Sequence, residues 1–258
     1  MTRRALLWER EADTAFAIPR MKTPLLLAAT ALLAFSTNSR SAETKSLPVR
    51  MVIVGDSTVC NYPETDVRRG WGMFLQDYFK DDVKVINLAA SGRSTKTFIS
   101  EGRWEKALAE KPTVVLIQFG HNDSHAPDRP EATDAATAFK DFLRRYVDET
   151  RAAGATAILV TPMCRRTFEP DGKLKDELQP YADAMKEVAK EKKASVIDLH
   201  ASSKKAFEAL GAKPCEELAN KEGDFTHFNA KGAKMMAELV MKELPAAEPT
   251  LKSHLKTP

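Results

Sequence analysis

Five short apolar runs alternate with longer amphipathic stretches along most of this chain, and this alternation constrains the fold more than any other feature. The runs are rich in valine, isoleucine and leucine and are bounded by glycine, proline or aspartate. This is typical of strands buried in a parallel sheet. The runs span residues 49–54, 83–88, 113–119, 155–161 and 194–199.

The stretches between the runs carry apolar side chains at helical spacing, around residues 71–78, 139–147 and 181–189. A last helix is expected over residues 230–244, ending before Pro245. Strands that alternate with helices predict a single doubly wound, flavodoxin-like α/β/α sandwich. Its sheet should have five strands and be mostly parallel.

We place this domain at residues 43–245 and expect the polar, proline-containing residues 246–258 to form a flexible tail. Residues 1–42 are interpreted as an N-terminal extension and signal peptide. Met21-Lys22 precedes an apolar run over 25–35 and then small polar residues, which is the three-part pattern of a secretory signal. The run is too short to anchor the chain stably in a membrane, so we expect a secreted or periplasmic protein. Met1 and Met21 both remain possible starts.

The charge distribution argues against a nucleic-acid partner. Residues 1–41 contain six basic and three acidic side chains, which accounts for the whole formal net charge of +3. The acidic and basic residues of the remainder of the chain are equal in number, so the sequence gives no sign of a basic surface for nucleic acid. We expect a monomer whose partner is its substrate.

The three cysteines, Cys60, Cys164 and Cys215, leave two possibilities open: one disulfide with a spare thiol, or simple burial of all three. The sequence contains neither a CxxC pair nor cysteine and histidine at metal-ligand spacing. No metal site is therefore expected.

Polar clusters follow the predicted strands, at the carboxyl edge where open α/β sheets bind ligands. Ser57 in Gly55-Asp56-Ser57-Thr58-Val59 follows the first run, and a serine there can act as a nucleophile or simply form a turn. Asp224 stands three residues before His227, where it can orient the imidazole as a base, or cap the following helix.

Two further loops can supply donors to a developing oxyanion. Asn122 follows the third run, and Gly92 allows a backbone N–H to approach a ligand closely. Each cluster alone could equally form an ordinary turn, because its residues are common in turns. Acyl transfer needs all of the clusters together.

The clusters also carry a family resemblance. GDSTV, NLAASGRS, FGHND and DFTH resemble, in this order, the four blocks of SGNH (GDSL-type) hydrolases. Longer stretches, including EGRW at 101–104 and VTPMCRRTF at 160–168, resemble rhamnogalacturonan acetylesterases. The resemblance covers roughly residues 49–240.

The resemblance implies that Ser57 is the nucleophile, His227 the base and Asp224 its orienting carboxylate. Ser57, Gly92 and Asn122 would form the oxyanion hole. It also implies that no metal or organic cofactor is needed. The expected function is removal of acetyl groups from a polysaccharide such as rhamnogalacturonan or another pectin, through an acyl-enzyme.

Three more residues are predicted to contact substrate: His121, beside the expected oxyanion hole, and Arg93 and Arg165, whose guanidinium groups suit a uronate carboxylate. Structural ion pairs are the alternative for these arginines. Two other functions stay open: a lipase-like or broad-specificity acylhydrolase of the same family, and a non-catalytic carbohydrate-binding module on the same fold.

Overall fold

The computed structural model describes residues 48–257, which belong to one compact unit. The predicted extension and signal peptide at residues 1–42 lie outside the described residues. All five predicted strands are present, within two residues of the expected bounds. They are β1 (Val49–Gly55), β2 (Val83–Asn87), β3 (Val114–Gln118), β4 (Thr156–Val160) and β5 (Ser195–Ile197).

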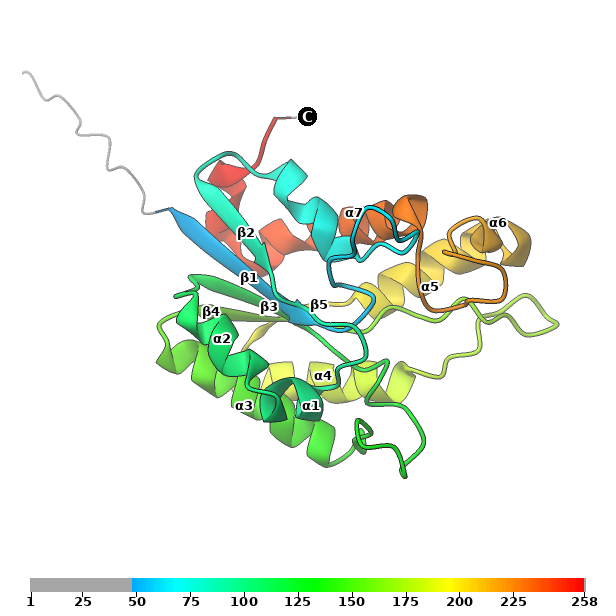
Figure 1. Cartoon of the computed structure of the whole chain (residues 1–258), viewed down its shortest axis with the longest axis horizontal. Coiled ribbons are helices and arrows are strands. Elements are labelled where there is room, and N and C mark those ends of the chain that lie inside the picture. The colour runs from blue at the N-terminus through cyan, green and yellow to red at the C-terminus, as the bar shows by residue number, and fades with distance from the viewer. Residues whose placement is uncertain (1–47, 258) are drawn as a thin grey trace, which may run out of the picture. The chain divides into compact units, whose positions relative to one another are not determined.

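The strands form one sheet in the order β2-β1-β3-β4-β5, and every neighbouring pair is parallel. This confirms the doubly wound α/β prediction. Helices cover both faces of the sheet (Figure 1). One face carries α1 (Thr95–Ser100), α2 (Arg103–Ala109), α3 (Ala138–Ala152) and α4 (Gln179–Lys192). The other face carries η1 (Trp71–Tyr78), α5 (Leu199–Leu210), α6 (Ala212–Glu216) and α7 (Ala230–Ala247).

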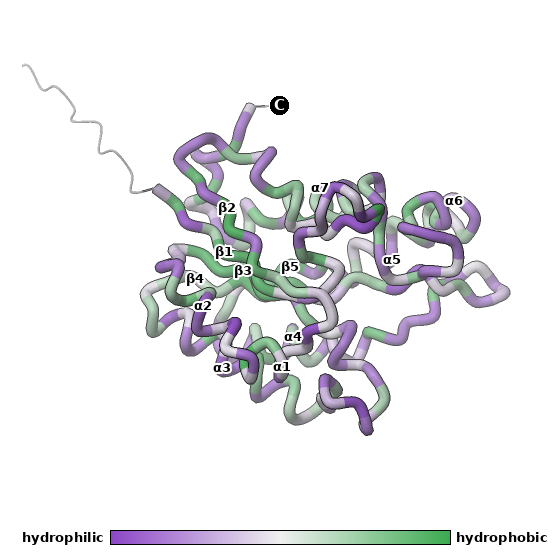
Figure 2. Tube along the Cα trace, viewed as in Figure 1, coloured by the Kyte–Doolittle hydropathy of each residue, from purple (hydrophilic) through white to green (hydrophobic). Residues whose placement is uncertain are grey.

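Alternate residues of the strands enter two separate cores, one on each side of the sheet. In β1, Met51 and Ile53 pack on the η1 and α7 side, whereas Val52 and Val54 pack on the α1–α4 side. Because both faces are covered, the middle parts of β1, β3 and β4 are continuously apolar (Figure 2), whereas the edge strand β2 carries the exposed Lys84. The carboxyl ends of β1 and β3 lie side by side, so their polar loops meet at one edge.

The structure corrects two predictions at the C-terminal end. Helix α7 continues to Ala247 with Pro245 inside it, because a proline in the last turn removes only its own N–H from the helical ladder. The expected flexible tail instead forms η2 (Pro249–His254), in which Leu251 is buried. The N–H of Lys256 donates to the carbonyl of Tyr78, so the end of the chain packs against η1.

All three cysteines are buried and free, which excludes the disulfide alternative for this structure. Within residues 48–257, no helix has the length and apolar character needed to cross a membrane.

Candidate active site

Ser57 lies in a tight turn directly after β1, at the carboxyl edge of the sheet. The turn is held by Asp56, whose Oδ1 accepts hydrogen bonds from the N–H (2.9 Å) and the hydroxyl (2.8 Å) of Thr58. The hydroxyl of Tyr62 donates to the carbonyl of Ser57 at 2.8 Å. These contacts fix the backbone that presents the Ser57 hydroxyl.

His227 and Asp224 come from the loop that precedes α7, and the structure brings both to Ser57. Nε2 of His227 lies 2.9 Å from the Ser57 hydroxyl oxygen, and Nδ1 lies 2.9 Å from Oδ2 of Asp224. With Nδ1–H donating to the carboxylate, the lone pair on Nε2 faces the hydroxyl and can accept its proton.

Asp224 stays ionised because its carboxylate receives several hydrogen bonds. Burial is the largest influence and opposes ionisation. The backbone and ring N–H groups of His227 and the N–H of Thr226 outweigh it, and the pKa of Asp224 lies below its usual value. Its Oδ1 accepts from the N–H groups of His227 (2.8 Å) and Thr226 (2.9 Å), so this carboxylate shapes the loop as well as orienting the ring.

Gly92 and Asn122, the two predicted oxyanion donors outside the nucleophile turn, are joined through Arg93. One N–H of the Asn122 side chain donates to the Arg93 carbonyl at 3.0 Å, which leaves the second for a ligand. Gly92 has a φ of +78° and nothing within 4 Å of the position a Cβ would take, so a side chain there would project into open space. Glycine is the residue that adopts this conformation without strain.

Asp123 locks these two loops together, and the sequence analysis did not single it out. Its carboxylate accepts from the N–H and hydroxyl of Thr95, the hydroxyl of Thr133 and the N–H of Gly120. Its burial raises the pKa to about 6 despite these donors. In the sequence, only its position next to Asn122 indicated that Asp123 could belong to the site.

His121 is not placed as predicted. Its ring is buried rather than open to substrate, with Nδ1 3.4 Å from Oδ2 of Asp56. Burial lowers the pKa of His121, while Asp56 opposes that shift. The side chain therefore lies beneath the nucleophile turn, whereas the amide of its neighbour Asn122 is turned to the Arg93 carbonyl.

Arg93 and Arg165 make contacts within the protein. Arg93 pairs with Glu101 at 3.0 Å and is partly exposed. Arg165 donates to the hydroxyl of Thr226 (2.7 Å) and to the carbonyl of His121 (3.1 Å), so it spans two loops of the site. Both arginines therefore have partners within the protein, and their contact with substrate stays a prediction.

Arg166, the neighbour of Arg165 in the chain, is buried behind the histidine loop. One of its terminal nitrogens donates to the carbonyls of both Asp224 and His227, each at 2.8 Å. Its backbone N–H donates to the carbonyl of Phe225 at 2.8 Å, and its guanidinium lies 4.3 Å from the ring centroid of Phe228. Burial lowers its pKa to about 10. Arg166 thus holds the histidine loop in place.

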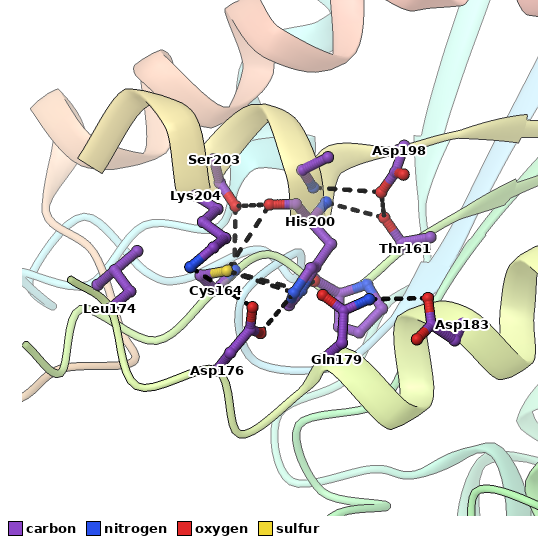
Figure 3. Close-up of polar contacts among 12 residues, drawn as sticks. Thr161, Cys164, Leu174, Asp176, Gln179, Asp183, Asp198, His200, Ser203 and Lys204 are labelled. Carbon is purple, nitrogen blue, oxygen red and sulfur yellow. Dashed lines mark hydrogen bonds and ion pairs between the residues drawn. The ribbon is translucent and has the colours of Figure 1, made fainter. Parts of the chain in front are cut away.

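A second polar cluster lies behind the loop that follows β4 and joins Cys164, Asp176 and His200 (Figure 3). Their potential metal-ligand atoms lie within 4.8 Å of one another, a grouping that sequence spacing could not reveal because the residues come from three segments. The Cys164 sulfur is 3.5 and 3.6 Å from the two ring nitrogens, so it sits over the imidazole and not in line with a nitrogen lone pair.

The cluster is better suited to anchoring than to binding a metal. Nε2 of His200 lies 2.7 Å from Oδ1 of Asp176, and Nδ1 lies 3.0 Å from the carbonyl of Pro162. Lys204 already supplies a cation 3.5 Å from the other Asp176 oxygen. Burial raises the pKa of Cys164 to about 12, which opposes the thiolate that a metal requires.

Comparison with known proteins identifies the family. A sequence model of the GDSL-like lipase/acylhydrolase family matches residues 53–235, which include all four blocks described above. The chain belongs to this family. As a GDSL-like acylhydrolase it is a hydrolase of carboxylic ester bonds.

Relatives of this acylhydrolase include two proteins of Bacillus subtilis (strain 168). Rhamnogalacturonan acetylesterase RhgT is 38% identical over 81% of this chain and 94% of its own length. Probable rhamnogalacturonan acetylesterase YesY is 37% identical over 78% of this chain and 97% of its own length.

Solved structures share the fold. The crystal structure of YxiM from Bacillus subtilis superposes with a TM-score of 0.69 at 30% identity, covering 77% of this chain and 56% of that one. Axe2, an acetylxylan esterase from Geobacillus stearothermophilus, superposes with a TM-score of 0.59 at 20% identity, covering 76% of this chain and 94% of its own. At that identity, the likeness to Axe2 concerns the fold alone.

Proposed function

We propose that this acylhydrolase removes acetyl groups from a carbohydrate, with an acetylated pectin such as rhamnogalacturonan as its polymer. Two relatives named as rhamnogalacturonan acetylesterases, aligned over about four fifths of the chain, support this substrate class. The observation that carries the reaction type is the continuous hydrogen-bonded series from Asp224 through His227 to Ser57. A series of this kind serves to activate a serine for acyl transfer.

In the proposed reaction, His227 takes the hydroxyl proton of Ser57 as its oxygen attacks the acetyl carbonyl carbon. The resulting oxyanion receives hydrogen bonds from the N–H groups of Ser57 and Gly92 and from the Asn122 amide. The intermediate collapses and expels the sugar hydroxyl, which takes its proton from His227. Water, deprotonated by His227, then attacks the acetyl-enzyme and releases acetate.

Acetate release from a panel of polymers tests the proposal. The purified protein should release acetate from acetylated pectin, and Ser57→Ala should lose this activity while keeping its circular dichroism spectrum. A Ser57→Ala variant with more than a few per cent of wild-type turnover would overturn the assigned nucleophile. No release from any acetylated polymer would overturn the carbohydrate assignment.

Assays of the purified protein with short and long acyl esters distinguish the acetylesterase from the lipase-like alternative. p-Nitrophenyl acetate should be hydrolysed with a higher kcat/KM than p-nitrophenyl octanoate. The reverse order would favour a long-chain acylhydrolase. Absence of labelling of Ser57 by a serine-directed phosphonate, with sugar binding retained, would favour a non-catalytic module.

We further propose that the protein is exported, because a polysaccharide substrate is too large to enter a cell and residues 1–42 have the pattern of a secretory signal. N-terminal sequencing of protein isolated from the periplasm and medium should find a start near residue 42. Full-length chain confined to the cytoplasm would overturn this proposal.

A further inference from the structure

Two hollows flank the loop that leads to His227. The larger, of about 570 Å³, is bounded by the 166–168 segment, by α6 with the residues that follow it, and by the 221–225 loop. The smaller, of about 430 Å³, is bounded by the 63–67 loop and by Asn220 and Lys221. Lys221 lines both hollows, so they adjoin each other across this loop.

Both hollows are built from the segments that carry the candidate triad. Asp224 itself forms part of the wall of the larger hollow. The 63–67 loop begins six residues after Ser57, and Tyr62 at its base donates to the Ser57 carbonyl. At its far end the N–H of Arg69 donates to the carbonyl of Phe228 at 2.8 Å, one residue beyond His227. A ligand held in these hollows therefore contacts the loop that carries Asp224 and the loop that follows Ser57; Ser57 and His227 themselves line neither hollow.

Exposed apolar side chains concentrate at these hollows. Among the described residues, only Val67, Leu210 and Phe225 are large, apolar and exposed. Phe225 lines the larger hollow, Val67 lines the smaller one, and Leu210 lines neither. Phe225 is 48% exposed, although the backbone on either side of it is tightly fixed.

The position of Phe225 is held without using its ring. Its carbonyl accepts from the Arg166 N–H, and its neighbours Asp224 and Thr226 are held in the hydrogen bonds described above. The exposed part of the ring therefore contributes nothing to the folded core, because its apolar surface stays in contact with solvent. An exposed aromatic ring at the rim of a hollow is suited to stacking on the apolar face of a pyranose.

We infer that the two hollows form one groove for the sugar chain of the substrate, and that the Phe225 ring is the platform on which a sugar residue next to the acetylated one stacks. This inference rests on the proposed carbohydrate esterase function and adds the binding site and its main residue. Phe225 acts in substrate binding and takes no part in proton transfer.

Comparison of polymer and small-ester kinetics tests the inference. Phe225→Ala should raise KM for acetylated pectin oligosaccharides about tenfold, as expected for losing a buried aromatic contact, with kcat little changed. The effect on p-nitrophenyl acetate, which has no neighbouring sugar, should be at least fivefold smaller. Phe225→Trp, which keeps a stacking surface, should restore the wild-type KM.

Leu210→Ala is the matched control, because it removes an exposed apolar side chain that lines neither hollow. It should leave KM for both substrates unchanged. Equal losses on both substrates for Phe225→Ala would overturn the inference in favour of a role in shaping the triad loop. An unchanged polymer KM would also overturn it.

Two further measurements separate this inference from its alternatives. Calorimetric binding of a deacetylated pectin oligosaccharide to Ser57→Ala should be weakened by adding Phe225→Ala, and equal binding by both variants would overturn the inference. Sedimentation should show a monomer for wild type and Phe225→Ala alike; a wild-type dimer that dissociates in the variant would assign Phe225 to a protein interface instead. If wild type releases no acetate from any polymer, the proposed function itself fails, whatever Phe225→Ala does.

Discussion

The guanidinium of Arg166 donates a 2.8 Å hydrogen bond to the carbonyl oxygen of His227. The same nitrogen donates to the carbonyl of Asp224, so one buried cation ties the two ends of the short loop that carries the candidate base and its carboxylate. The spacing of the imidazole from Ser57 therefore depends on a residue that does not reach the reacting atoms.

Replacement of Arg166 by methionine should lower kcat on p-nitrophenyl acetate about 10- to 100-fold, because a small displacement of a catalytic group costs about that much. KM should change much less. Arg166→Lys should recover part of the loss, since both carbonyls accept from a single terminal nitrogen, which an ammonium group can replace. Kinetics alongside thermal unfolding tests this, with Arg145→Met on α3 as the control for losing an exposed arginine. A variant with a lowered Tm and an unchanged kcat would reduce Arg166 to a role in stability alone.

Asp224→Asn should lower kcat by about 10⁴-fold, since an amide favours the wrong imidazole tautomer and leaves Nε2 unable to accept the serine proton. The low pKa of Asp224 means that the wild-type carboxylate stays charged through mildly acidic pH. Steady-state kinetics with p-nitrophenyl acetate measure the loss. An Asn variant with wild-type kcat would show that this carboxylate only shapes the loop.

Asn122→Ala should lower kcat about 10²- to 10³-fold, the usual cost of one oxyanion donor, with little change in KM. The second N–H of this amide is the one expected to donate to the oxyanion, because the first already donates to the Arg93 carbonyl. Gly92→Ala should also be harmful, since its φ of +78° strains any other residue. A larger effect of Asn122→Ala on KM than on kcat would assign Asn122 to ground-state binding.

His121 should make the protein less stable as the pH falls below about 6.5, the ordinary value for histidine. Burial lowers the pKa of His121, so the unfolded chain binds the proton more readily than the folded one. The free energy of unfolding then falls with decreasing pH, by at most about 1.4 kcal/mol per pH unit for one group.

Urea unfolding of wild type and His121→Gln at pH 7.5, 6.5 and 5.5 measures this dependence. The difference between the two proteins should narrow toward acid, because the variant lacks the titrating ring. Parallel curves across this range would show that His121 contributes nothing to the acid sensitivity.

Asp176→Asn should destabilise the fold by about 1–3 kcal/mol, the cost of weakening a buried charge-assisted hydrogen bond. Its partner His200 is 2% exposed (Figure 3) and bonds to the carbonyl of Pro162, in the loop that continues to Arg165 and Arg166. Chemical denaturation measures the loss, with Asp171→Asn on the exposed part of the same loop as control. Equal stabilities of the two variants would contradict an anchoring role.

The sequence by itself determined the layered architecture and the four loops that carry the polar blocks. Strand identity depends on local apolar patterning, and the carboxyl ends of parallel strands necessarily share one edge. For this reason Ser57 and Asn122 could be placed at that edge before any coordinates were known. The chain-end prediction failed because whether residues 249–257 pack depends on the distant surface of η1, which no local pattern describes.

Only the tertiary structure decided which polar side chains face the site and which support it. Arg165 and Arg166 are adjacent and chemically identical, yet one spans two loops at the site and the other lies buried behind the histidine loop. His121 and Asn122 likewise diverge, one beneath the nucleophile turn and the other beside it. The physical reason is that burial and hydrogen-bond partners are set by segments far away in the chain, so neighbours with the same chemistry acquire different roles.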